Sequence, residues 1–251
     1  MVNSKKSSTF APAVPVIPLP NFVLVTNPGF CFVMEDFDIL VSAFSQQRLN
    51  KYLVFNKGDK TRAVLHYKAN LRLAESLYIS LSVFEVALRN ALSRELHIMV
   101  GREDWFDIFT AMPELQPLKV DVDKAISQIQ RRKEVVTTDK IISELTFGFW
   151  VALLNSQYER VLWKTLRKAF PHVPKNLRQR KNISAPCNTL RLLRNRIFHQ
   201  EAICWDLRYV SFLHQDLVKV LGWINADIAS WLKTIDPFDD VCCSIRKQMG
   251  W

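Results

Sequence analysis

The amino-acid sequence predicts an all-α protein, and three observations carry this prediction. Leucines recur at helical spacing over a long segment in the first half of the chain, which gives a helix with one apolar stripe. Other helical patterns are bounded by residues that typically cap helices, such as Gly101, Thr138 and Asp206. Hydrophobic residues make up 49% of the 251 residues, which is ample for a core. We therefore expect a bundle of about six to eight helices over residues 36–251, preceded by a disordered or extended N-terminal arm over residues 1–35.

The N-terminal arm combines Lys5 and Lys6 with several serines and four prolines in its first 20 residues. These prolines interrupt the apolar core that a signal peptide needs, so we expect no secretory leader. Residues 21–33 are apolar and β-branched around a central Asn-Pro-Gly, a pattern typical of a small hairpin or an extended strap.

The first half of the domain is predicted to be dominated by one long helix. Shorter helices are expected to begin near Asp36 and Ser45, ahead of a turn over residues 57–60. The long helix then spans about Thr61 to Met99 and ends at Gly101. Its apolar stripe consists of Leu73, Leu77, Leu81, Leu88, Leu92 and Leu96.

The middle of the chain is predicted to add shorter helices. Trp105 and Phe106 are expected to anchor the connection over residues 102–120. Thr138 is expected to cap a helical stretch that continues to Leu154. The aromatic residues of this stretch are assigned to the core rather than to stacking on nucleobases; they are Phe147, Phe149 and Trp150.

The last third is predicted to contain the central helix and two more. A helix over residues 158–169 precedes a basic loop over 171–183, and Pro186 sets the approach to the central helix at 190–201. Asp206 is expected to cap a helix that reaches about Leu232, with Ile228 and Trp231 directed inward. Asp236, before a proline, is expected to cap a short final helix.

The net charge of +10 is concentrated in one segment. Eleven lysines and arginines, and no acidic residue, lie between Arg160 and Gln200. Because a solvated helix surface usually mixes both signs, this acid-free segment predicts a site for a polyanion such as RNA, the alternative being a basic surface without a ligand. The side chains expected to contact RNA are Lys175, Arg178, Arg180, Lys181 and Arg191.

Composition excludes several other classes of site. The five cysteines and five histidines have no zinc-binding spacing, so we expect no metal and no cofactor. The six glycines form no phosphate-binding run, which argues against a P-loop or a dinucleotide-binding fold. An odd number of cysteines without a secretory signal favours reduced thiols in a cytoplasmic protein. No apolar run is long enough to span a bilayer.

The segment LRLLRNRIFHQE, residues 190–201, is predicted to form one helix that carries Arg194, Asn195 and His199. On a helical wheel Arg194 lies in the middle of an apolar arc, about 140° from His199. A guanidinium in such an arc must be paired or must line a cleft. Two interpretations follow: an arginine that snorkels beside a structural histidine, or a catalytic pair.

Glu85 interrupts the leucine stripe of the long helix, where a carboxylate needs a cationic partner. Arg89, one turn later, can supply that partner locally as an exposed ion pair. Alternatively, Glu85, Arg89 and Asn90 face the helix of Arg194 and hold it in position.

The pattern Arg-Asn-x-x-x-His on a helix is similar to the R-x(4–6)-H signature of the HEPN superfamily. A wider set of segments resembles its Abi-like (abortive infection) branch over about residues 40–245. These segments are FEVALRNAL at 84–92, the region around Trp105, ELTFGFW at 144–150, LWKTLRKAFP at 162–171 and LRNRIFHQEAI at 193–203. The resemblance favours the interpretation in which Glu85 faces the helix of Arg194.

The resemblance implies a HEPN-like bundle and a metal-independent endoribonuclease, acting as a toxin or abortive-infection effector. His199 would serve as acid or base, Arg194 would hold the phosphate, and Asn195 would orient one of them. The supporting residues would be Glu85, Arg89, Asn90 and Glu201. Ribonucleases of this superfamily commonly act as dimers, so a homodimer is expected, with an antitoxin or defence-system protein as a further partner. The alternative function is a non-catalytic module of the same fold that binds RNA or protein.

Overall fold

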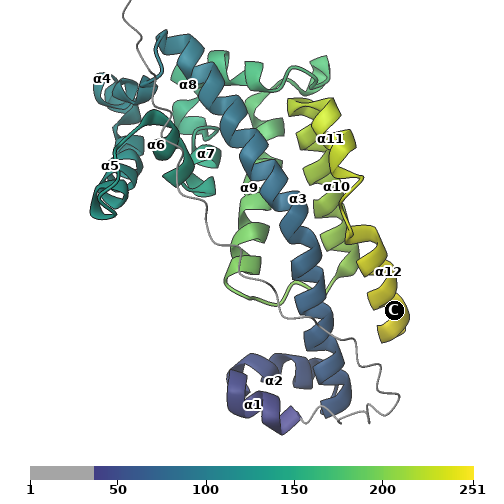
Figure 1. Cartoon of the computed structure of the whole chain (residues 1–251). Helices are drawn as coiled ribbons and strands as arrows, with labels where there is room; N and C mark the ends of the chain where they lie inside the picture. Colours follow the sequence, from purple (N-terminus) through teal and green to yellow (C-terminus); the bar gives the residue numbers. More distant parts are fainter. Residues whose placement is uncertain (1–36) are drawn as a thin grey trace, which may run out of the picture.

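The computed structural model describes residues 37–251, and the arm predicted over residues 1–35 lies outside this range. Within the described range the chain forms α-helices and short 3₁₀ segments without a β-strand, which confirms the all-α prediction (Figure 1). The α-helices are α1 Phe37–Phe44, α2 Gln46–Phe55, α3 Lys60–Val100, α4 Ile108–Ala111, α5 Gln116–Arg131, α6 Thr138–Glu144, α7 Phe147–Ala152, α8 Glu159–Leu166, α9 Arg180–Phe198, α10 Leu207–Ile224, α11 Ala226–Leu232 and α12 Phe238–Met249.

Helix α3 is the spine on which the other helices assemble. Its 41 residues make it about 60 Å long. Asp59 caps its start by accepting a hydrogen bond from the Arg62 N–H, and Gly101 ends it in the left-handed conformation, with φ 80°. All six leucines of the predicted stripe are buried. The predicted bounds of about 61 to 99 are therefore confirmed.

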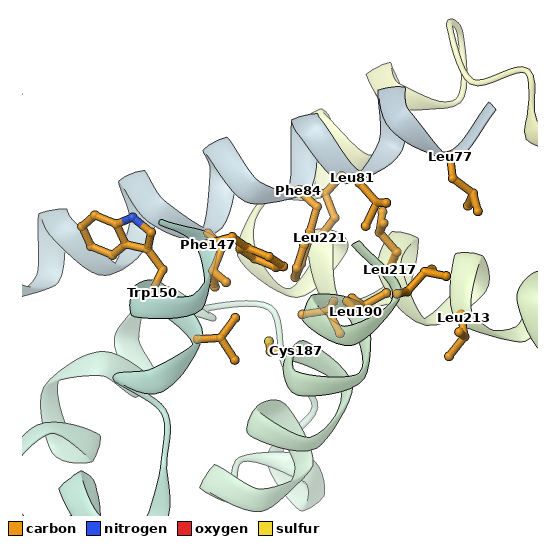
Figure 2. Packing of buried hydrophobic residues seen from close by; sticks show 14 of the residues in the cluster. Leu77, Leu81, Phe84, Phe147, Trp150, Cys187, Leu190, Leu213, Leu217 and Leu221 are labelled. Carbon is orange, nitrogen blue, oxygen red and sulfur yellow. The ribbon is translucent and has the colours of Figure 1, made fainter. Parts of the chain in front are cut away.

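The core lies where α3 meets helices from the second half of the chain. Figure 1 shows α1 and α2 at one end of α3, and α7, α8 and α9 along its other half. In Figure 2, Phe84 of α3 meets Phe147 of α7, with ring centroids 6.0 Å apart, and Leu190 of α9 lies near Leu217 of α10. Each such buried apolar side chain contributes roughly 1.5–3 kcal/mol. Helix α9 is thus held on its inner face by α3, α7 and α10.

The aromatic residues of α7 belong to this core. Phe147, Phe149 and Trp150 are all buried, which confirms their assignment to packing rather than to nucleobase stacking. Trp105 is also buried, and its indole N–H donates to the hydroxyl of Ser93 on α3. Trp105 therefore anchors the connection after α3, as expected.

The described residues contain twelve α-helices, more than the six to eight expected. Two of the additional helices, α4 and α5, begin within the segment predicted as a connection over residues 102–120. The others arise because side-chain caps divide two predicted helices. Thr137 accepts from the Lys140 N–H at the start of α6, and Thr146 accepts from the Phe149 N–H at the start of α7. The stretch predicted as one helix from Thr138 to Leu154 is therefore two short ones.

The helix predicted to run from Asp206 to about Leu232 also breaks. Asp206 caps its start as expected, but Asn225 has an extended backbone and accepts from the N–H groups of Asp227 and Ile228. This cap starts α11 in a new direction. Ile228 and the indole of Trp231 are consequently exposed, so their predicted inward direction was wrong.

Helix α9 begins earlier than predicted. It starts at Arg180, and Pro186 lies inside it rather than on its approach. A proline in a helix interior forgoes one backbone hydrogen bond. Burial of Ile183 and Cys187, on either side of the proline, holds this turn against the core. None of the helices in residues 37–251 has an apolar stretch long enough to cross a membrane.

Candidate functional site

The C-terminal half of α9 carries the residues predicted to form a site. Leu190 and Leu193 are buried on its inner face, while Arg194, Asn195 and Ile197 are partly exposed at the edge. Arg194 therefore lies where the apolar arc of the helix meets solvent. One side of the guanidinium therefore faces other residues of the protein, and the other side faces solvent.

On its protein side Arg194 faces Glu85 of α3. The Arg194 Nε atom is 3.5 Å from the Glu85 Oε2 atom, and the two side chains are 29% and 26% exposed. The Nε atom is buried yet makes no hydrogen bond, so the pair is a Coulombic contact without hydrogen-bond geometry. Of the two partners that the sequence allowed for Glu85, the structure has the one on α9.

Arg194 also stacks on an aromatic ring. The Cζ atom of its guanidinium lies 4.0 Å from the centroid of the Phe198 ring, one turn later on α9. The Phe198 ring in turn lies 6.1 Å from that of Tyr78 on α3. Glu85, Arg194, Phe198 and Tyr78 form a continuous row across the two helices, which we call the α3–α9 row. Cation–π contact holds the arginine flat without using its N–H donors.

His199 lies just beyond α9 rather than within it. The helix ends at Phe198, and His199 is its C-cap, with its N–H donating to the carbonyl of Asn195 at 2.9 Å. Gln200 then reverses the chain with φ 55°. The prediction of one helix over 190–201 was therefore too long by three residues. His199 is exposed, and its ring makes no side-chain hydrogen bond among the described residues.

The segment after His199 is fixed by residues that sequence reasoning missed. Asn70, buried on α3, accepts from the Ile203 N–H at 2.7 Å and donates to the carbonyl of Glu201 at 3.4 Å. Arg48 of α2 donates to the carbonyl of Gln200 at 3.1 Å. The sequence signal for Asn70 was an amide within the buried face of α3. These bonds set the end of α9, and with it the position of His199.

The other residues predicted to support the site do not contact Arg194. Glu201 is exposed and lies 3.4 Å from the Nε of Arg196, not from Arg194. Arg89 donates weakly to its neighbour Asn90 at 3.4 Å, and Asn90 is exposed. Among the residues predicted to support the site, the structure therefore brings only Glu85 to Arg194.

The predicted RNA-binding residues divide into two kinds. Arg178 donates to the carbonyls of Pro171 and Val173, and Arg180 pairs with Glu159 at 2.8 Å and with the carbonyl of Leu154. These two arginines hold the loop before α9. Lys175 and Lys181 are exposed, and Arg191 is half-buried on α9. The free cationic surface of this group therefore consists mainly of the lysines.

Among the described cysteines, Cys187, Cys204 and Cys242 are buried and Cys243 is exposed. Burial raises the pKa of the Cys187 and Cys204 thiols to about 12, which leaves them protonated at neutral pH. Residues 37–251 contain no group of three or more histidine, cysteine or carboxylate side chains that could hold a metal ion.

Comparison of the chain with models of known protein families, with curated proteins and with solved structures found no match. The resemblance to the Abi-like branch of the HEPN superfamily therefore stays a prediction from sequence motifs. The all-helical fold agrees with it only at the level of fold class.

Proposed function

We propose that this protein is a metal-independent endoribonuclease whose site lies at the C-terminal end of α9. The observation that supports the proposal is the position of Arg194 at the partly exposed edge of α9, with His199 at the C-terminal end of the same helix. Arg194 is held by Glu85 and Phe198 while part of its side chain stays exposed, and the exposed His199 follows five residues later. An arginine and a histidine at the end of an acid-free basic helix suit a phosphodiester substrate.

The reaction would use the 2′-hydroxyl of RNA as its nucleophile. His199 takes the proton of this hydroxyl, and the oxygen attacks the adjacent phosphorus. Arg194 stabilises the negative charge that grows on the phosphate oxygens. The bond from phosphorus to the 5′-oxygen breaks, and that oxygen takes up a proton. The products carry a 2′,3′-cyclic phosphate and a 5′-hydroxyl.

One helix supplies one histidine, whereas the leaving 5′-oxygen also needs a proton donor. We propose that a second copy of the chain supplies it, so that two α9 ends face each other across one cleft. This homodimer rests on the resemblance to HEPN ribonucleases. An antitoxin or another defence-system protein is a further proposed partner on the same ground.

A second candidate function is a module that binds RNA without cutting it. The specific observation that favours it is the engagement of Arg194 with Glu85 and Phe198, which would also suit a purely structural arginine. The basic surface of Lys175 and Lys181 would then be the functional part. The two candidate functions differ in whether the protein cleaves the RNA that it binds.

The test is incubation of the purified full chain with total RNA in the presence of EDTA, followed by analysis of the fragment ends. We expect cleavage with cyclic or 3′-phosphate ends, and a loss of about 10²- to 10⁴-fold in His199→Ala, the range of general acid–base catalysis. His172→Ala, another exposed histidine, is the matched control and should cleave normally. Mg²⁺-dependent cleavage with 5′-phosphate ends would contradict the mechanism. Equal RNA affinity of both variants without any cleavage would establish the binding module instead.

A further inference from the structure

Two aromatic rings from different helices are exposed side by side next to the candidate site. Tyr78 of α3 and Phe198 of α9 are 55% and 50% exposed. Their ring centroids lie 6.1 Å apart, and the ring planes are inclined by 35°. Packing does not require large rings at positions that stay half in solvent. This pair is therefore a candidate for contact with a ligand.

The pair is coupled to the charged residues of the site. The Arg194 guanidinium lies over the Phe198 ring, and His199 directly follows Phe198 in the chain. Tyr78 lies two turns before Glu85 on the same side of α3. A ligand resting on the two rings would therefore lie within reach of both an arginine and a histidine.

The charges around the pair indicate what kind of ligand it takes. Helix α9 carries five cationic residues and no carboxylate: Arg180, Lys181, Arg191, Arg194 and Arg196. The α3 side carries Glu75 and Glu85, and Glu85 already faces Arg194. Arg180 and Arg196 are already paired with Glu159 and Glu201, but an apolar segment of another protein would offer no negative group to Arg191 or to the exposed part of Arg194. A nucleotide supplies both a flat ring for the aromatic pair and a phosphate for α9.

We propose that Tyr78 and Phe198 form a stacking platform for an unpaired nucleobase of RNA. The proposal rests on the proposed function in that it takes RNA as the ligand, and it names the substrate class as single-stranded RNA. A base within a duplex is stacked on its neighbours and cannot lie on a protein ring. The platform places the phosphate of the stacked nucleotide along α9, beside Arg194.

The test measures binding rather than cleavage, so that it stands even when no cleavage is found. The probe is a fluorescent 2′-O-methyl RNA strand, which lacks the nucleophilic hydroxyl and stays intact. Fluorescence anisotropy compares three forms: the single strand, the same strand with abasic central nucleotides, and the duplex. We expect the single strand to bind about five- to 150-fold more tightly than the abasic strand, which corresponds to about 1–3 kcal/mol for a base–aromatic stack.

Four variants connect this preference to the platform. Tyr78→Ala should weaken binding of the intact strand by a similar factor, yet leave binding of the abasic strand unchanged. Phe198→Leu should weaken binding of the intact strand more than binding of the abasic strand, because Phe198 also contacts Arg194. Phe198→Tyr and Tyr78→Phe keep the rings and should restore binding. Thermal unfolding verifies the fold, which these half-exposed positions should not disturb.

The matched controls are Phe212→Leu and Tyr209→Ala on α10, whose side chains are 54% and 48% exposed. Neither should change the preference for the intact strand. Equal weakening by the α10 controls, or equal loss on intact and abasic strands, would overturn the proposal. So would a dimer, seen by sedimentation velocity, that dissociates in Phe198→Leu without RNA, because the rings would then be a contact between two copies.

Discussion

Among the carboxylates that pair with a side chain on another helix, Asp236 and Glu85 differ in how closely they approach their partners. Asp236, ahead of α12, lies with its Oδ2 atom 2.6 Å from the Nε2 atom of His214 on α10. Its Oδ1 atom accepts from the Phe238 N–H at 3.1 Å, and the His214 ring stacks on that of Phe238 at 4.1 Å. Both side chains are nearly buried. The Asp236–His214 pair therefore joins α10 to the start of α12.

In the Glu85–Arg194 pair, by contrast, the charged atoms are in contact but not hydrogen-bonded to each other. Its atoms approach only to 3.5 Å, no hydrogen bond forms, and about a quarter of each side chain is exposed. A pair joined by a short hydrogen bond has fewer free donors and acceptors for a ligand than a pair whose atoms make no hydrogen bond. The difference teaches that burial and hydrogen-bond saturation, rather than residue type, separate architecture from a candidate site.

The largest effect is expected from Asp236→Ala. The substitution strands the buried imidazole N–H of His214 and removes the capping acceptor of α12, so the free energy of unfolding should fall by about 2–4 kcal/mol. Denaturant unfolding measures this loss, and RNA binding per folded molecule should not change. Asp240→Ala, at an exposed position of α12, is the control. If Asp236→Ala lowers the free energy of unfolding no more than Asp240→Ala does, the Asp236–His214 pair does not stabilise the fold.

The acid-free segment, residues 160–200, also contains both exposed cations and cations that are hydrogen-bonded within the protein. Lys175 and Lys181 are exposed, whereas Arg178 and Arg180 hold backbone carbonyls. Replacing both lysines with alanine should leave stability unchanged and make the slope of log affinity against log salt shallower by about 1.4 for single-stranded RNA.

Binding titrations at several salt concentrations measure this slope. The control replaces Lys119 and Lys124 of α5, which pair with Asp123 and Asp121. An unchanged slope in the Lys175 and Lys181 variant would place the RNA surface elsewhere on the molecule.

A smaller effect on stability is expected from the ionisation of His66, a fully buried histidine of the core. It is buried among the rings of Tyr52, Phe55, Trp205 and Trp251, and burial lowers its pKa. Below about pH 6.5 the His66 imidazole takes up a proton in the unfolded chain but not in the folded chain. The free energy of unfolding is therefore retained above pH 6.5 and falls as pH drops below it.

His66→Phe should therefore flatten the decline in unfolding free energy between pH 7 and pH 5. Chemical denaturation at these pH values provides the measurement, with the exposed His97→Phe as control. Equal pH dependence in the wild type and in His66→Phe would mean that His66 is not the titrating group.

Elements governed by local pattern could be predicted from the sequence. The leucine stripe and the left-handed Gly101 fix α3, and Asp206 caps α10 where expected. The N-cap of α12 is Pro237 rather than Asp236, although Asp236 accepts from the Phe238 N–H. The breaks at Thr146 and Asn225 were missed because a side-chain cap competes with a helical pattern that continues through it.

The candidate site was predicted only in part. The apolar arc around Arg194 required the guanidinium to be paired or to line a cleft, and the structure pairs it with Glu85. The end of α9 depends on Asn70 and Arg48, which are distant in sequence and bind the following segment. No local pattern could therefore place His199 outside the helix or bring Tyr78 next to Phe198.

The measurement that tests the central claim most directly pairs a melting curve with a cleavage assay on Arg194→Lys. Lysine keeps the charge beside Glu85, and since this pair is partly exposed we expect a stability change below about 1 kcal/mol. Lysine cannot grip a phosphate with two parallel N–H groups, so cleavage should fall by at least about 100-fold. Arg196→Lys, two residues on, is the matched control and should retain activity. A stable and fully active Arg194→Lys protein would contradict the claim and leave Arg194 as part of the architecture.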